Sequence, residues 1–158
     1  METFTKVHVV ISLIGIASGL IIVFGMLAAH GFDRWTALFL LSTLATSVTG
    51  FLFPFHGVTP GIVVGIISVV VLAIAIFARY PQHLRGSWRW NYVVSAVVAL
   101  YLNVFVLIAQ LFQKVPQLKA LAPTQSEPPF AVTQLGVLVL FVLLGIVATI
   151  KFRVESRA

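Results

Sequence analysis

Apolar residues form long uninterrupted stretches in this chain, and charged residues are confined to the short segments between them. A helix that crosses a bilayer needs about 20 consecutive apolar residues, because the hydrocarbon core is about 30 Å thick. Three of the four charge-free stretches suit one crossing each, and the second is about twice as long as a crossing requires. The charged residues at the two ends of each stretch are, in order, Lys6 and Asp33, Arg34 and Arg79, Arg89 and Lys114, and Glu127 and Lys151.

The second stretch contains a segment that ends one helix and begins another. A single helix over residues 35–78 would be roughly 65 Å long at about 1.5 Å per residue, which is twice the hydrocarbon thickness. Residues 54–61 interrupt it with two prolines and two glycines. Thr59 followed by Pro60 is typical of an N-cap and the first residue of a helix, since proline lacks only an N–H that would be unpaired there. The stretch is therefore predicted to be a helical hairpin.

The predicted fold is all-α: a polytopic transmembrane helical bundle with five spans, in a single domain that covers residues 1–158. An outer loop over residues 114–130 contains four prolines, which disfavour a continuous helix. Within this loop, residues 117–121 are expected to form one interfacial turn. The predicted spans are residues 7–29, 35–54, 60–79, 91–113 and 131–150.

The composition agrees with lipid as the solvent for much of the surface. The chain of 158 residues is 60% apolar and only 9% charged, whereas soluble domains contain about 25% charged residues. The net charge of +6 comes from basic residues at the ends of apolar stretches, so the expected partner is the lipid headgroup region and not nucleic acid. The chain has no cysteine, which excludes disulfides and thiolate chemistry.

The basic residues are unequally divided between the two sides of a five-span bundle. One side would hold Lys6, Lys114 and Lys119. The other side would hold the remaining seven, which are Arg34, Arg79, Arg85, Arg89, Lys151, Arg153 and Arg157. Because basic residues are enriched in cytoplasmic loops, the N-terminus is predicted to lie outside and the C-terminus in the cytoplasm.

Glycines at helical spacing are candidates for helix packing. Gly15 and Gly19 form a GxxxG motif in the first span, and Gly61 and Gly65 form another in the third. Such motifs let a second backbone approach closely, because glycine has no side chain. The motifs therefore predict packing contacts, either within the bundle or with a homo-oligomer or membrane-protein partner.

Polar residues inside the predicted spans form a candidate intramembrane cluster. An unsatisfied amide in hydrocarbon costs several kcal/mol, so Asn103 is expected to face the bundle and hydrogen-bond a hydroxyl of the second span. Such contacts could hold helices together or line a polar path. The cluster consists of Ser42, Thr43, Thr46, Asn103 and Gln110.

Four histidines are candidates for binding a cofactor, with haem as the group to consider. The topology predicts two level pairs, His8 with His56 outside and His30 with His83 inside. His8 and His30 would be about 33 Å apart along a helix, which places both at the interfaces, where hydration explains a histidine without any ligand. No cofactor and no metal site is therefore predicted, and haem stays an alternative.

No catalytic residue is predicted from the sequence. Phosphate-binding loops, nucleophile elbows and HExxH zinc motifs are absent from the sequence. Asp33 is interpreted as the exposed partner of the adjacent Arg34, a pair that contributes little. The other carboxylates, Glu2, Glu127 and Glu155, also fall in predicted loops or tails, so no buried acid is expected for a proton relay.

Two segments resemble small, uncharacterised multi-pass proteins of the bacterial inner membrane. They are YLNVFV at residues 101–106 and APTQSEPPF at residues 122–130. The resemblance extends over the second to fifth spans. It implies a bacterial cytoplasmic membrane and implies no activity, cofactor or site.

The favoured hypothesis is a non-enzymatic accessory or binding component of the membrane that packs through its GxxxG faces. The first alternative is a small-solute transporter or channel-like protein, with Ser42, Thr46 and Asn103 along the path. The second alternative is a haem- or quinone-linked membrane electron carrier.

Overall fold

The computed structural model describes residues 2–30, 32–54 and 56–152, and every regular element in these ranges is a helix. Four of the helices, α1, α3, α4 and α6, are long and apolar enough to cross a membrane. The other long helix, α2, carries Asp33 and Arg34 in its first turn and six serine or threonine residues. The bounds are α1 (Glu2–Leu27), α2 (Asp33–Gly50), α3 (Pro60–Arg79), α4 (Trp88–Lys114), α5 (Pro116–Leu121) and α6 (Pro128–Lys151).

A helix is present at each predicted span, but several ends differ from the prediction. The first helix begins at Glu2, where an exposed ion pair of 2.8 Å with Lys6 extends the first turns. The second ends at Gly50 and not at residue 54, because glycine is a poor helix former and Pro54 restricts the residue before it. The last begins at Pro128 and not at residue 131, since proline is tolerated in the first turn.

The predicted start of the third helix is confirmed. Thr59 is the N-cap, with extended backbone angles, and its side chain accepts a hydrogen bond of 3.3 Å from the amide of Ile62. Pro60 is the first helical residue. The predicted turn in the outer loop is also present, as the short helix α5.

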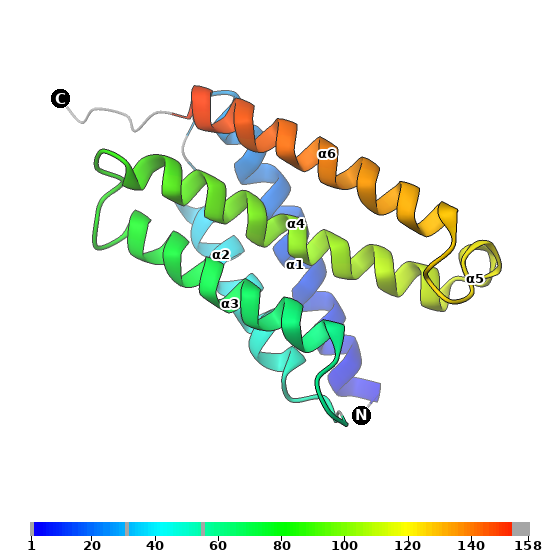
Figure 1. Cartoon of the computed structure of the whole chain (residues 1–158). Coiled ribbons are helices and arrows are strands. Elements are labelled where there is room, and N and C mark those ends of the chain that lie inside the picture. The colour runs from blue at the N-terminus through cyan, green and yellow to red at the C-terminus, as the bar shows by residue number, and fades with distance from the viewer. Residues whose placement is uncertain (1, 31, 55, 153–158) are drawn as a thin grey trace.

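The helices form two layers that cross at an angle (Figure 1). The helices α3, α4 and α6 lie side by side in one layer, with α4 in the middle, and α1 and α2 pair behind them. Helix α4 contacts each of the other five helices of the described chain. It is the central element of the fold.

The helices converge at one end of the molecule and spread apart at the other (Figure 1). The converging end, called the basic end below, is formed by the ends of α1, α3 and α6 and the starts of α2 and α4. The opposite end is formed by the other helix termini and α5. The described basic residues of the basic end are Arg34, Arg79, Arg85, Arg89 and Lys151. Arg153 and Arg157, assigned to the same side from the sequence, lie outside the described residues.

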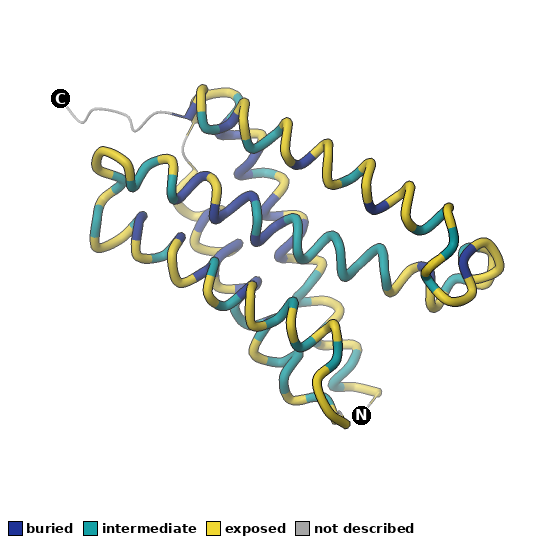
Figure 2. The backbone as a smooth tube through the Cα atoms, viewed as in Figure 1, coloured by how far each residue is buried: buried dark blue, intermediate teal, exposed yellow. Residues whose placement is uncertain are grey.

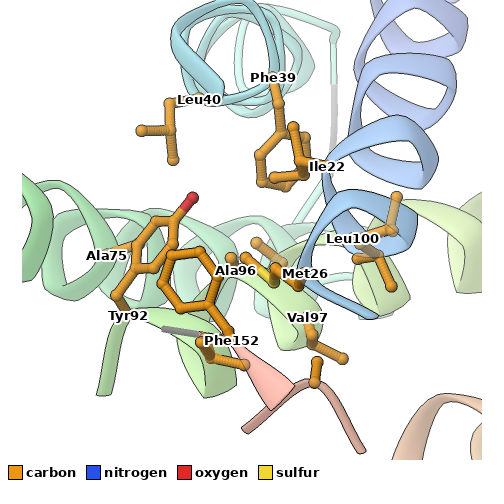
Figure 3. Packing of buried hydrophobic residues seen from close by; sticks show 14 of the residues in the cluster. Ile22, Met26, Phe39, Leu40, Ala75, Tyr92, Ala96, Val97, Leu100 and Phe152 are labelled. Carbon is orange, nitrogen blue, oxygen red and sulfur yellow. The ribbon is translucent and has the colours of Figure 1, made fainter. Parts of the chain in front are cut away.

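Most of the buried core lies in the half of the bundle toward the basic end (Figure 2). The helices α3 and α4 contact each other extensively, and each has two fully buried alanines, Ala75 and Ala78 on α3 and Ala96 and Ala99 on α4. Small side chains let helix backbones approach closely, which strengthens the dispersion contacts between them. Larger residues from α1, α2 and α4 fill the remaining space, as Figure 3 shows around Tyr92.

Candidate functional site

Charged and aromatic side chains at the basic end are tied together across three helices. The carboxylate of Asp33 on α2 lies 2.5 Å from the guanidinium of Arg79 at the end of α3. The same guanidinium lies 5.3 Å from the ring centroid of Tyr92 on α4, within cation–π range. The Arg79 side chain is only 10% exposed, whereas that of Asp33 is 78% exposed. The predicted pairing of Asp33 with Arg34 is therefore wrong, because the antiparallel arrangement of α2 and α3 brings Arg79 to the same place.

A second arginine fastens α6 to α4 at this end. Nη1 of Arg89 donates to the carbonyl of Thr149 at 2.9 Å and also to the carbonyl of Phe152. These carbonyls belong to the last turn of α6 and to its C-cap, where backbone acceptors have no intrahelical partner. Phe152 in turn packs against Tyr92, with ring centroids 5.9 Å apart (Figure 3). The sequence signalled positive charge here but not these specific contacts.

A water-sized cavity of about 10 Å³ lies beside these groups. That volume is about the minimum that one water molecule occupies. Its lining consists of Ile22, Met26, His30, Phe32, Thr36, Arg79, Tyr92 and Phe152. Four of these side chains carry polar groups, so the cavity is suited to an ordered water and not to a substrate.

Part of the predicted polar cluster meets around Gly15. A Cβ placed on Gly15 would lie 3.1 Å from Nδ2 of Asn103, 3.1 Å from Oγ1 of Thr43 and 3.4 Å from Oγ of Ser42. The absence of a side chain on Gly15 thus makes room for polar groups from α2 and α4. Nδ2 of Asn103 and Oγ1 of Thr43 are both buried without a hydrogen-bond partner. The predicted hydrogen bond from Asn103 to a hydroxyl of the second span is therefore not formed, although the two elements do meet.

The other members of the predicted cluster do not join this meeting point. Thr46 is buried, and its hydroxyl donates to the carbonyl of Ser42 at 2.8 Å within α2. Gln110 is exposed near the end of α4. Its position one heptad beyond Asn103 does not bury it, because α4 diverges from α1 and α2 toward the opposite end (Figure 1).

The predicted histidine candidates lie in different surroundings. His8 lies between α1 and α2, with Nδ1 2.7 Å from Oγ1 of Thr49 and its ring edge-on to Phe53. The other three are exposed and lie in connections between helices: His30, His56 and His83. Within the described ranges, no group of three or more histidine and acidic side chains is placed to hold a metal ion.

The two GxxxG motifs differ in what they contact. A Cβ on Gly19 would lie 2.6 Å from Leu100 and 2.9 Å from Phe39, so Gly19, like Gly15, faces α2 and α4. Gly65 faces the ring of Phe51, 2.9 Å from the position of a Cβ. Gly61 is exposed and meets only its own N-cap residue. The glycines of the first motif therefore pack against other helices of the same chain.

An apolar groove between α4 and α6 was not predicted from the sequence. It has a volume of about 420 Å³, within the ~300–1,000 Å³ typical of small-molecule sites. The hydroxyl of Thr149 in its wall donates to the carbonyl of Gly145 at 2.7 Å, so it is already bonded. The lining residues are Val94, Val97, Val98, Tyr101, Leu138, Phe141, Val142, Gly145, Ile146, Thr149 and Ile150. Only the spacing of Leu138, Phe141 and Gly145 along one face of α6 could have indicated the groove.

A buried glutamine continues the α4–α6 contact beyond the groove. Gln134 is 8% exposed, and its Nε2 donates to the carbonyl of Phe105 at 3.2 Å. Its Oε1 is buried without a partner. The sequence places Gln134 one turn before Leu138, but it was not included in the predicted cluster.

The loop between α5 and α6 forms a compact turn closed by its own side chains. The Glu127 carboxylate accepts hydrogen bonds from the hydroxyl and amide of Thr124, the hydroxyl at 2.7 Å, and from the amide of Ser126. The Thr124 hydroxyl bond is the main reason that the pKa of Glu127 lies below its usual value. Nε2 of Gln125 donates to the carbonyl of Ala109 at 2.7 Å, which fastens the turn to α4.

No protein-family model, no curated protein and no solved structure matches this chain.

Proposed function

We propose that the chain is a five-span membrane protein in which α2 is the fifth span. The start of α2 meets the end of α3 through Asp33 and Arg79. The segment after α2 meets the start of α1, where the rings of Phe53 and Phe4 are 4.9 Å apart. If α1 and α3 cross the bilayer, α2 must return the chain between them. Its 18 residues correspond to about 27 Å of helix, close to the hydrocarbon thickness.

The hydroxyl groups of α2 are compatible with this position. Ser42 donates to the carbonyl of Leu38 at 2.6 Å, and Thr49 donates to that of Ala45 at 2.7 Å. A hydroxyl bonded to its own helix is inexpensive to bury in lipid. The two charged residues of α2 lie in its first turn, at the basic end.

The same proposal places the basic end in the cytoplasm and the N-terminus outside. The described arginines of the connections gather at the basic end, as expected for cytoplasmic loops. The exposed rings of Trp90 and Tyr80 lie at this end too, at the level that amphipathic aromatic residues prefer. The proposed location is the bacterial inner membrane, as expected from the sequence of residues 101–106 and 122–130.

Within that membrane, the proposed role is that of a non-enzymatic binding component whose α4–α6 groove takes the hydrocarbon chain of a lipid. The observation that carries this role is the groove itself, about 420 Å³ in volume and lined almost entirely by apolar side chains. The hydroxyl of Thr149 in its wall already donates to a backbone carbonyl. A bound molecule would therefore contact the groove mainly through apolar atoms. The glycines of the first GxxxG motif pack inside the bundle. We therefore propose the face of α6, in place of this motif, as the binding surface.

A phosphatidylcholine with a diazirine on its acyl chain tests this role. Irradiation of the reconstituted protein should crosslink residues of α4 and α6 that line the groove. Ile146→Trp, which adds bulk at a half-exposed groove residue, should weaken labelling by about fivefold because overpacking displaces the chain. Leu143→Trp is the matched control, since Leu143 is similarly exposed on α6 but lies outside the groove.

The outcome can contradict each part of the proposal separately. Equal labelling of the two tryptophan variants would remove the groove as a lipid site. A change of oligomeric state in Ile146→Trp alone would show that a second copy occupies the groove. A reporter fused after Lys151 that is active only outside the cytoplasm would overturn the orientation and leave the groove untouched.

Solute transport is the second candidate, and the unpaired atoms beside Gly15 favour it. Nδ2 of Asn103 and Oγ1 of Thr43 are free to bond a water molecule or a polar solute. Neither of the two cavities described above is lined by Asn103 or Thr46. Proteoliposome flux that Asn103→Leu abolishes would establish transport in place of the binding role.

A further inference from the structure

The groove between α4 and α6 covers the depth of one lipid leaflet. From Leu138 to Ile150 it follows α6 for roughly 18 Å at about 1.5 Å per residue, close to half of the ~30 Å hydrocarbon core. On α4 it begins at Val94, near the start of the helix, and ends at Tyr101 in the middle. The groove therefore runs from the basic end to the centre of the bundle, where the ring of Tyr101 packs against Phe141.

Two basic residues lie where the groove opens at the basic end. Lys151 directly follows the last groove residue of α6 and is exposed. Arg89 lies one turn before the first groove residue of α4 and reaches the carbonyl of Thr149, which lines the groove. Both described bonds of Arg89 use Nη1, and a guanidinium carries five N–H donors in all. The one acidic residue that the structure describes at this end, Asp33, is paired with Arg79.

We propose that the groove binds one chain of an anionic phospholipid from the leaflet at the basic end, with its phosphate held by Lys151 and Arg89. This inference rests on the proposed binding role of the groove and adds the chemical class of the headgroup. The apolar walls match a single acyl chain in length, and the basic mouth distinguishes an anionic headgroup from a zwitterionic one. A basic residue near the headgroup level contributes about 1 kcal/mol toward an anionic lipid, or about fivefold in affinity.

Competition against the diazirine-labelled phosphatidylcholine tests the headgroup separately from the groove. Unlabelled dioleoylphosphatidylglycerol and dioleoylphosphatidylcholine are added in turn to the reconstituted full chain. The phosphatidylglycerol should suppress crosslinking at about one-fifth of the concentration that the phosphatidylcholine requires. Lys151→Gln should abolish most of this preference, and Lys151→Arg should restore it.

The matched control is Lys119→Gln, which removes an exposed lysine of α5 at the opposite end. It should leave the preference unchanged, because a general attraction between anionic lipid and a basic protein would respond to either lysine. Lys151 is exposed at a helix terminus, so its replacement should not unfold the bundle, and a thermal melt of each variant verifies this.

The outcomes separate the two levels of the proposal. Equal competition by the two lipids, with crosslinking still sensitive to Ile146→Trp, would overturn the anionic headgroup and retain the chain-binding groove. An equal loss of preference in Lys119→Gln and Lys151→Gln would also overturn the specific headgroup site. Crosslinking that neither lipid suppresses and Ile146→Trp does not change would overturn the groove as well.

Discussion

The basic end and the opposite end of the bundle differ in how their polar groups are bonded. At the basic end, Arg79 bridges Asp33 and the ring of Tyr92, and Arg89 caps α6. Toward the middle and the opposite end, two buried atoms, Nδ2 of Asn103 and Oε1 of Gln134, lack partners. Buried polar groups are normally paired, so the difference indicates that the basic end fixes the fold. The rest of the bundle has unpaired donors and acceptors to which an ordered water or a ligand can hydrogen-bond.

Apolar side chains are also packed more closely near the basic end than along α6. Near the basic end α1, α2 and α4 approach so closely that glycine is required, whereas α6 carries Gly136 with open space around it. Along most of α6 the apolar side chains are exposed to the surroundings (Figure 2). Substitutions of the same type should therefore have different effects in the two regions.

The largest effect is expected from a side chain added at the close approach. Gly19→Leu should destabilise the bundle by about 3 kcal/mol, the upper part of the range for overpacking. The reason is that the first added carbon already lies 2.6 Å from Leu100. Thermal unfolding in detergent measures the loss, and Gly136→Leu on α6 is the control that should change little. Equal melting temperatures for the two variants would contradict the described contrast.

A smaller loss is expected when the ion pair of the basic end is removed. Arg79→Ala should destabilise the fold by about 2 kcal/mol, less than for a fully buried pair, because Asp33 stays exposed to solvent. Part of the loss comes from the cation–π contact with Tyr92. Arg85→Ala, an exposed arginine of the same end, is the control. Chemical denaturation that finds both variants alike would show that the charge cluster does not stabilise the fold.

The opposite sign is expected for the unpaired amide. Asn103→Leu should raise stability by about 1 kcal/mol, because an apolar group of similar size replaces a buried donor without a partner. Asn91→Leu should not stabilise, since the amide of Asn91 donates to the carbonyl of Ser87 at 3.0 Å. Thermal unfolding of both variants decides the matter. A clear loss in Asn103→Leu would indicate that the amide is bonded in the membrane, by a water or a solute.

Much of the helical layout could be predicted from the sequence, because lipid imposes long self-bonded apolar segments. The hairpin break at Pro54 and Pro60 and the N-cap at Thr59 follow from local backbone chemistry, and they were found. Helix ends were less certain, as at Gly50 and Pro128, because caps and prolines shift an end without changing the apolar pattern.

The site was less predictable, because it depends on how the helices rotate against one another. The sequence suggested that Asn103 meets the second span, and it does lie beside Thr43, but the geometry leaves both unpaired. It could not show that Arg79, distant in sequence from Asp33, would displace Arg34 as its partner. The α4–α6 groove is formed by two apolar helix faces. In sequence these faces cannot be distinguished from any other lipid-facing surface.

The smallest effect is expected at the opposite end, where the turn around Glu127 should loosen in acid. Its folded pKa lies below the usual 4.5, chiefly because the Thr124 hydroxyl donates to the carboxylate. A carboxyl with a depressed folded pKa contributes stability that is present above its unfolded pKa and is lost as the pH falls through the folded value. Protonation removes the negative acceptor that organises Thr124 and Ser126, so the protection of their amide protons, measured against the intrinsic exchange rate at each pH, should fall below pH 4.5. Glu127→Gln should show this low protection at every pH. Unchanged protection of these amides across that range would mean that the carboxylate does not hold the turn.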